Sequence, residues 1–362
     1  MVFLGFFIDL SMLKTAVFTD YTMVSKHLKT ALLLISLLTV SSLTKGQEAH
    51  FSQYNRAPLQ LNPALTGAFY GDWRVGNNYR SQWSGVLKKP ITTIGLGFEK
   101  PIYLDIDKIA VGVYALRDQA GDKGFNTTRV ALSGAYHKLV DYSELRFGFQ
   151  MAYTSKVIDK NLSFPESFNR VTGEFDPDLV FLEPLARDQV SFVDINFGVS
   201  WGMYFEDFRP EVGLAFFHVN QPTESFYGSS NKRETGIAAN ASFKYFVSDN
   251  FFIDPNFMLF TQSKANNFLA GVAGGYQFDP NNAGVTDANF GFLLRNGFSD
   301  NADAFIVHAG LGVSNFDAGI SYDFNISQLK EGLSSNGTIE FSISYTSPST
   351  RLIKTKIDSE RL

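Results

Sequence analysis

Histidines are the residues whose chemistry is easiest to recognise in this chain of 362 residues, because imidazole binds metals and transfers protons near neutral pH. No two of those that follow the first 46 residues share a spacing typical of metal ligands. A hydrolase with a Ser/His pair stays open as an alternative, but we expect no nucleophile elbow to support it. The pattern therefore predicts structural histidines and no catalytic residue, cofactor or metal. The five are His27, His50, His137, His218 and His308.

Two glycine-rich stretches and one acidic turn are further candidates for ligand sites. Gly95-Leu96-Gly97 and the run from Gly271 to Gly275 lie inside predicted strands, where glycine permits tight curvature or a crowded interior. The string Asp279-Pro280-Asn281-Asn282 carries oxygen atoms suited to calcium, but an ordinary turn explains it better. None of the three stretches predicts a bound ligand.

The segment at residues 47–70 combines apolar side chains with prolines. Pro58 and Pro63 exclude it from a central strand, and Asn62 before Pro63 favours a turn. Its aromatic and apolar content means that it should not float free. We expect it to pack into the periplasmic mouth of a larger structure, or to dock a partner there. The packing would come from Tyr54, Leu61 and Phe69.

Composition limits the fold class without deciding it. The chain has no cysteine, which excludes disulfides and thiolate metal sites. Its net charge of −5 is spread along the sequence and gives no sign of nucleic-acid binding. A mean hydropathy of −0.05 is too low for a bundle of membrane helices. It suits either a soluble protein or a barrel whose strands alternate between lipid and lumen.

Residues 23–46 have the form of an export signal. Lys26 and Lys29 supply the charged region, and residues 31–40 supply an apolar core that precedes small and polar residues up to Gly46. This core is too short for a transmembrane helix, which needs about 20 apolar residues. We expect cleavage near Gly46, with residues 1–22 as a spurious upstream extension.

Beyond Trp73 the sequence alternates between apolar and polar residues with a period of two, as half-buried strands do. In the last strand, Phe341 falls on the apolar face and Glu340 on the polar face. We expect apolar faces to meet lipid and polar faces to line a wet lumen, so that replacing Glu340 by Gln is tolerated. The pattern predicts fourteen strands, at residues 73–83, 91–100, 109–117, 127–137, 144–155, 190–205, 209–218, 235–247, 250–262, 266–278, 287–297, 302–313, 316–325 and 337–346.

The lengths of the connections favour a barrel over a soluble sandwich. Even-numbered connections such as 138–143 and 248–249 are short, whereas the odd-numbered 156–189 and 219–234 are among the longest. Outer-membrane barrels have short periplasmic turns and longer outer loops. We therefore predict an all-β fold, a transmembrane antiparallel β-barrel of about fourteen strands at residues 73–346. An N-terminal periplasmic or plug segment would occupy residues 47–72, and a C-terminal tail residues 347–362.

Several motifs resemble those of the PorP/SprF family, outer-membrane proteins of the type IX secretion and gliding machinery. The most specific ones lie in the N-terminal segment: Phe51-Ser52-Gln53-Tyr54, then Leu61-Asn62-Pro63-Ala64 and Gly67. The strings at 212–222, 319–329 and 336–345 resemble strands of the same family. The resemblance covers residues 47–346, and the tail after Ser347 departs from it.

The resemblance implies a non-enzymatic component of this secretion machinery in the outer membrane. Its partners would be periplasmic ring or motor-linked components and a secreted surface adhesin as cargo. A porin-like or hydrophobic-solute transporter barrel is the alternative. The residues implied as a docking or plug element are Phe51, Ser52, Gln53, Tyr54, Leu61, Asn62, Pro63, Gly67 and Phe69.

Overall fold

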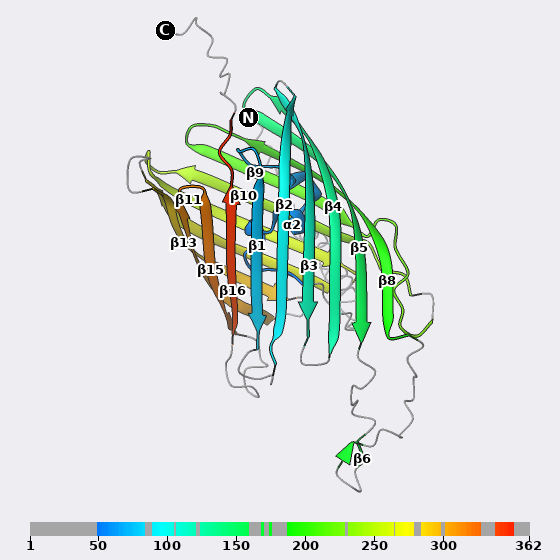
Figure 1. Ribbon diagram of the computed structural model, residues 1–362. Helices are drawn as coiled ribbons and strands as arrows, with labels where there is room; N and C mark the ends of the chain where they lie inside the picture. Colours follow the sequence, from blue (N-terminus) through cyan, green and yellow to red (C-terminus); the bar gives the residue numbers. More distant parts are fainter. Residues whose placement is uncertain are drawn as a thin grey trace, which may run out of the picture. The chain divides into compact units, whose positions relative to one another are not determined.

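The computed structural model contains a closed barrel of fourteen antiparallel strands (Figure 1). The expected export signal, the residues before it, the turn at 279–282 and the tail beyond residue 350 lie outside the described residues. The structure describes residues 49–83, 89–104, 106–120, 124–158, 168–169, 174–175, 187–228, 231–263, 265–278, 284–297, 301–326 and 337–350.

All fourteen predicted strands are confirmed, with bounds that differ by only a few residues from those expected. A further pair of two-residue strands, β6 (Phe168–Asn169) and β7 (Glu174–Phe175), forms a separate small sheet. The barrel strands are β1 (Arg74–Gln82), β2 (Ile91–Leu104), β3 (Asp107–Gln119), β4 (Phe125–Val140), β5 (Ser143–Ile158), β8 (Gln189–Met203), β9 (Phe208–Phe217), β10 (Gly236–Phe246), β11 (Phe251–Gln262), β12 (Ala265–Gln277), β13 (Val285–Gly297), β14 (Asn301–Val313), β15 (Phe316–Asn325) and β16 (Thr338–Thr346).

The first and last strands close the barrel. Arg74 at the start of β1 lies opposite Thr346 at the end of β16, and β1 pairs with β2 along its other edge. Closure leaves the sheet without an open edge, which is the condition for a β-structure to cross a membrane. Because Arg74 and Thr346 are partners, the sheet begins and ends at the same end of the barrel.

The two faces of each strand differ as the alternation predicts. On β16 the side chain of Phe341 is 46 % exposed, whereas that of Glu340 is 1 % exposed. The same outward pattern holds for Phe147 and Phe149 on β5 and for Ile320 on β15. An outer surface covered with exposed aromatic and aliphatic side chains suits contact with lipid. Among the described residues, no helix is both long and apolar enough to span a bilayer.

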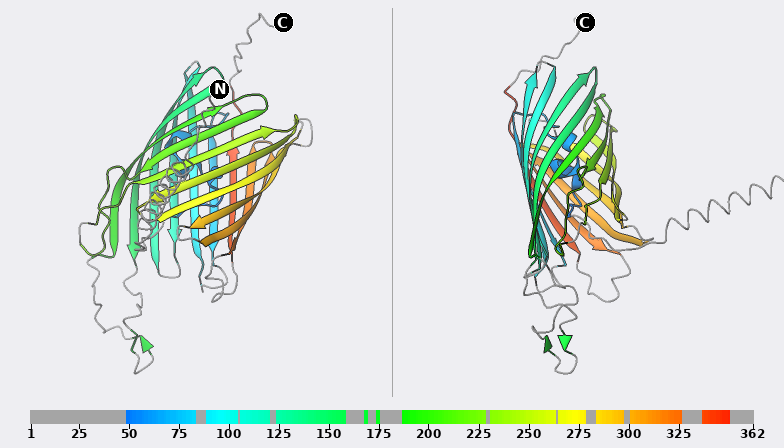
Figure 2. Two further views of the ribbon diagram at one scale, coloured as in Figure 1. Left: turned by 180° about the vertical axis from the view of Figure 1, so that it is seen from behind. Right: turned by 90° about the vertical axis from the view of Figure 1, so that its right-hand side faces the viewer.

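The N-terminal segment lies inside the barrel, between opposite walls (Figure 2). It contains three short helical turns, η1 (Tyr54–Arg56), α2 (Pro58–Leu61) and η2 (Pro63–Leu65). Prolines begin α2 and η2, where their missing N–H costs no helical hydrogen bond. The sequence predicts polar strand faces that line a wet lumen, but the inner segment fills part of that space. The polar side chains at this level are buried against protein and do not line a wet channel.

Candidate functional site

The first half of the N-terminal motif is bound to the closing strand through one carboxylate. The backbone N–H groups of Ser52 and Gln53 donate to the two oxygens of Glu340, at 2.7 and 3.0 Å. Arg80 on β1 donates to the same carboxylate at 2.8 Å and also to the carbonyl of His50 at 2.8 Å. Arg80 and Glu340 are each 1 % exposed. Glu340 is thus a buried partner and not the solvated lumen group that the sequence suggested, so its environment argues against the expectation that Glu340→Gln is tolerated.

A second buried carboxylate binds the side chain of Ser52. Asp323 on β15 accepts a hydrogen bond from Ser52 Oγ at 2.7 Å. Arg295 on β13 donates to both Asp323 and Ser52 Oγ, at 2.7 and 3.0 Å. Buried charges are tolerated only when they are paired and hydrogen-bonded. The motif serine thus completes a network of charges that four strands supply, β1, β13, β15 and β16.

Tyr54 fixes the segment to the opposite wall. Its hydroxyl donates to Asn256 Oδ1 on β11 at 2.9 Å. Burial raises the pKa of the Tyr54 phenol well above its usual range, so that the hydroxyl keeps its proton and remains a donor. The ring belongs to an apolar cluster formed with Leu61 and Leu65 of the segment and with Met258, Leu269, Leu293, Ala304 and Ile306 of the wall.

The turn at Asn62 packs against the barrel wall at two glycines, Gly148 and Gly198. Asn62 Oδ1 accepts from the N–H of Ala64 at 2.9 Å and so caps η2, while its Nδ2 donates to the carbonyl of Val199 at 3.2 Å. A Cβ on Gly198 would lie 1.9 Å from Asn62 Oδ1, and one on Gly148 would lie 2.2 Å from the backbone nitrogen of Ala64. Side chains at these two positions would push the turn off the wall. The predicted turn at Asn62 is present.

Gly67 ends the motif in a left-handed conformation, with a φ of +69°. Its N–H donates to Glu99 Oε2 on β2 at 2.8 Å, and Arg74 binds the other oxygen of this carboxylate at 2.7 Å. A Cβ here would lie 2.3 Å from that of Ala110 on β3. The guanidinium of Arg74 also lies 4.4 Å from the centre of the Phe69 ring.

The nine residues implied as a docking or plug element thus lie on one continuous inner segment. Their wall partners were not identified from the sequence. The only available signal was a charged residue on the inward face of a strand, and such residues are common in barrels. These missed partners are Arg80, Glu99, Arg295, Asp323 and Glu340.

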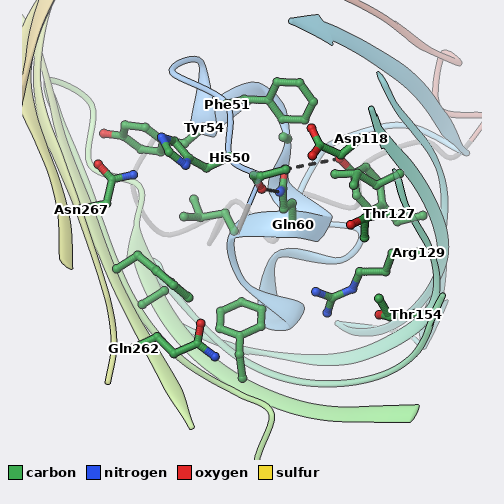
Figure 3. A pocket seen from close by; sticks show the side chains of 18 of the residues that line it. His50, Phe51, Tyr54, Gln60, Asp118, Thr127, Arg129, Thr154, Gln262 and Asn267 are labelled. Carbon is green, nitrogen blue, oxygen red and sulfur yellow. Dashed lines mark hydrogen bonds between the residues drawn. The ribbon is translucent and has the colours of Figure 1, made fainter. Parts of the chain in front are cut away.

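The inner segment separates two cavities. One, of about 210 Å³, is lined on the segment side by Phe51, Leu59 and Gln60. In Figure 3 the polar ends of Arg129, Gln262 and Asn267 are directed into this cavity. The other, of about 350 Å³, is lined by Asn55, Pro58, Ala68 and by rim residues such as Tyr204 and Arg209. Burial raises the pKa of the Tyr204 phenol to about 12, and its hydroxyl donates to Glu144 Oε2 at 3.3 Å and accepts from Arg146 Nη2 at 2.6 Å.

His137 and His218, which lie on or beside the wall, have separate partners. His137 Nε2 lies 2.8 Å from the carbonyl of Thr66, and its Nδ1 lies 3.0 Å from Glu144. His218 Nδ1 lies 2.6 Å from Asp194. In the part of the chain that the structure describes, no group of three or more His, Asp or Glu side chains could hold a metal.

One stretch of β8 does match the G-x-S-x-G motif of a nucleophile elbow, contrary to the expectation from the sequence. It runs Gly198-Val199-Ser200-Trp201-Gly202. An elbow places its serine on a sharp turn between a strand and a helix. Ser200 instead lies within β8, and it is 3 % exposed. The sequence therefore matches the motif, but the local structure is not that of a nucleophile elbow.

Comparison with protein families assigns residues 43–345 to the model described as type IX secretion system membrane protein PorP/SprF. The chain belongs to the PorP/SprF family. The match includes the inner segment and all fourteen barrel strands. Family and fold together place this PorP/SprF protein in the outer membrane. A search of curated proteins finds no match.

Solved structures similar to this PorP/SprF barrel include a toluene transporter and a monoaromatic hydrocarbon channel. The crystal structure of the Pseudomonas putida toluene transporter TodX is 10% identical and matches with a TM-score of 0.51, over 83% of this chain and 94% of that chain. The monoaromatic hydrocarbon channel CymD is 13% identical with a TM-score of 0.50, over 84% and 95%. At such low identity the likeness shows the barrel fold alone.

Proposed function

We propose that this barrel is a non-enzymatic part of the type IX secretion and gliding machinery that supports export or surface display of a cargo adhesin. The inner segment at residues 50–69 would be a fixed element that contributes to docking of periplasmic ring or motor-linked components. The observation that carries this proposal is the attachment of the segment. Its motif residues are held to five strands by buried or partly buried hydrogen bonds, while Asn55 remains exposed.

Asn55 gives the docking surface an accessible residue. It lines the cavity that also contains Tyr204, and the rim of this cavity lies at the end where β1 begins and β8 ends. In bacterial barrels the first strand usually begins, and the last strand usually ends, on the periplasmic side. With that orientation, this cavity would open toward the periplasmic machinery. Pro58 and Arg74 flank Asn55 in the same cavity. A partner could thus contact the segment without entering the barrel.

The test separates docking from packing by comparing two variants. Asn55→Lys changes the exposed position, whereas Tyr54→Ala removes a buried ring from the apolar cluster. Barrel assembly and the amount of cargo at the cell surface are measured in the same cells. We expect Asn55→Lys to assemble normally and to lose surface cargo. We expect Tyr54→Ala to reduce assembly and cargo together.

Two outcomes count against docking. Normal cargo in assembled Asn55→Lys would remove the exposed position from the proposal. If the amount of surface cargo is proportional to the amount of assembled barrel in both variants, the segment only stabilises the barrel as a plug. Gln60→Lys is the matched control, because Gln60 lies on the same segment but faces the other cavity.

A hydrophobic-solute transporter is the second candidate function. The apolar side chains in the mixed lining of the 210 Å³ cavity, such as Phe217, Met258 and Phe260, favour it, as does the fold shared with channels for aromatic hydrocarbons. Uptake of radiolabelled toluene by vesicles that contain the purified barrel would support this candidate. Uptake equal to that of empty vesicles would exclude it and leave the secretion role unaffected.

A further inference from the structure

Two positively charged side chains lie directly opposite each other on the inner face of neighbouring strands. Arg209 on β9 is the register partner of Lys244 on β10. Both line the cavity of about 350 Å³ that also contains Asn55, and both lie at the end of the barrel where β1 begins. Like charges directly opposite each other in an antiparallel pair repel and destabilise it. This arrangement therefore costs stability unless an anion binds between the two groups.

Within the described part of the chain, neither Arg209 nor Lys244 forms an ion pair with a carboxylate. The two acidic side chains of the cavity have other partners. Glu211 accepts from a buried arginine of β5 at 2.7 Å, and Asp254 accepts from a serine of β10 at 2.7 Å. Arg74, the remaining cation of this cavity, is paired with a carboxylate of β2 at 2.7 Å. The cavity thus contains two positive charges that no adjacent carboxylate neutralises.

Aromatic rings hold both cations in place. The guanidinium carbon of Arg209 lies 4.6 Å from the centre of the Phe246 ring, and the Lys244 amine lies 4.4 Å from that of Phe252. The two rings are buried and pack against each other, with their centres 5.8 Å apart. A ring face attracts a cation without neutralising its charge, and a stacked guanidinium can still donate from its edge to a carboxylate. The cations are therefore oriented while their charge stays uncompensated.

We propose that Arg209 and Lys244 bind a carboxylate side chain on an acidic segment of a periplasmic partner protein. The guanidinium binds the two oxygens of the carboxylate in parallel, and the lysine amine adds a point charge on its other side. Both side chains line an internal cavity shared with Asn55, so the site faces a partner at the end of the barrel and not the surrounding lipid. That the carboxylate comes from a periplasmic protein rests on the docking role proposed above.

The test couples a bound carboxylate covalently to Lys244. The purified barrel in phosphatidylcholine nanodiscs is mixed with a peptide of alternating glutamate and glycine and treated with a water-soluble carbodiimide. The reagent activates a glutamate carboxylate, a lysine amine displaces the activated oxygen as a urea, and an amide bond forms. Mass spectrometry then identifies the coupled lysines. Lys232 is the internal control, because it is exposed and lies at the opposite end of the barrel.

We expect the peptide to couple to the half-buried Lys244 in preference to the exposed Lys232. Equal coupling at the two lysines, or coupling at Lys232 alone, would overturn the proposal. Such a preference requires binding, since an exposed amine is otherwise the more accessible one.

Arg209→Gln tests the guanidinium while Lys244 stays in place. The change should lower coupling at Lys244 by about tenfold, which is the contribution of a hydrogen bond between charged groups. Arg209→Lys keeps the charge and should couple at Lys244 more than Arg209→Gln does. Both variants should assemble like the parent, because Arg209 is exposed and its loss relieves repulsion. Unchanged coupling at Lys244 in assembled Arg209→Gln would overturn the paired site.

Three outcomes separate this site from the docking role. No preference for Lys244, with surface cargo still lost in Asn55→Lys, would overturn the carboxylate site and leave docking in place. Coupling at Lys244, with normal surface cargo when Arg209→Gln and Lys244→Gln are combined in cells, would overturn the periplasmic partner as the source. Protection of Lys244 by added phosphatidylglycerol would assign the site to a lipid headgroup and would also overturn the partner.

Discussion

At the scale of single residues, the structure gives the closing strand a second role. Glu340 belongs to the inward face of β16 and completes the wall, and it also receives the backbone N–H groups of Ser52 and Gln53. A carboxylate that accepts several hydrogen bonds while fully buried needs a nearby cation, which Arg80 provides at 2.8 Å. Closure of the barrel and attachment of the inner segment therefore depend on the same group.

Glu340→Gln should lower the free energy of unfolding by about 3 kcal/mol, because it leaves the buried guanidinium of Arg80 without its closest charge partner. Asp323, at 3.7 Å from Arg80, compensates only in part. Urea unfolding in lipid vesicles, followed by tryptophan fluorescence, measures the change. Glu206→Gln is the control, since Glu206 is exposed in the turn before β9 and its loss should change stability by less than about 0.5 kcal/mol. Equal stabilities for the two variants would contradict the network.

Gly198 sets how closely the inner segment approaches β8. An added methyl group would lie 1.9 Å from Asn62 Oδ1, so Gly198→Ala should displace the turn and loosen the segment. We expect trypsin to cut after Arg56 in this variant and to spare that bond in the parent protein. Mass spectrometry would detect a new fragment that begins at Ala57. In Gly134→Ala the added methyl meets no atom closer than 3.8 Å, so this control should remain resistant. Resistance of both variants would mean that the segment does not depend on this contact.

At the scale of the elements, the strands could be predicted from the sequence and the partners of the inner segment could not. Lipid on one side and protein on the other impose an alternation that every strand repeats, as Phe341 and Glu340 show. Nothing comparable marks the partners of Ser52. Asp323 lies 271 positions away, and in the sequence it is one of many polar residues on inward faces. Such contacts depend on which strands face each other across the lumen, and local patterns do not carry that information.

The outward face of β16 tests the alternation directly. Phe341→Arg would place a charge where the parent side chain is 46 % exposed toward lipid. A charge on the lipid face costs about 2–4 kcal/mol near the middle of the bilayer. Assembly into vesicles, measured by the shift in gel mobility between unheated and boiled samples, should fall strongly. Phe341→Leu keeps the apolar surface and should assemble like the parent. Normal assembly of Phe341→Arg would mean that this face does not meet lipid.

At the scale of the whole molecule, closure fixes which connections share an end of the barrel. Because Arg74 pairs with Thr346, the turns at 141–142, 247–250 and 314–315 lie at the end where the sheet begins. The connection at 218–235 lies at the opposite end, together with a short one at 263–264 that departs from the general trend. Long connections gather mainly at one end, which in bacterial barrels is the outer one.

The orientation in the membrane follows from this arrangement and can be measured on cells. The chain has no cysteine, so a single introduced one reports its own position. Tyr227→Cys lies in the 218–235 connection, where Tyr227 is 55 % exposed, and it should react with a membrane-impermeant maleimide on intact cells. Asp249→Cys lies in an exposed turn at the other end and should react only after the outer membrane is permeabilised. The reverse pattern would place Asn55 and its cavity at the cell surface, and the inner segment could then not dock periplasmic components.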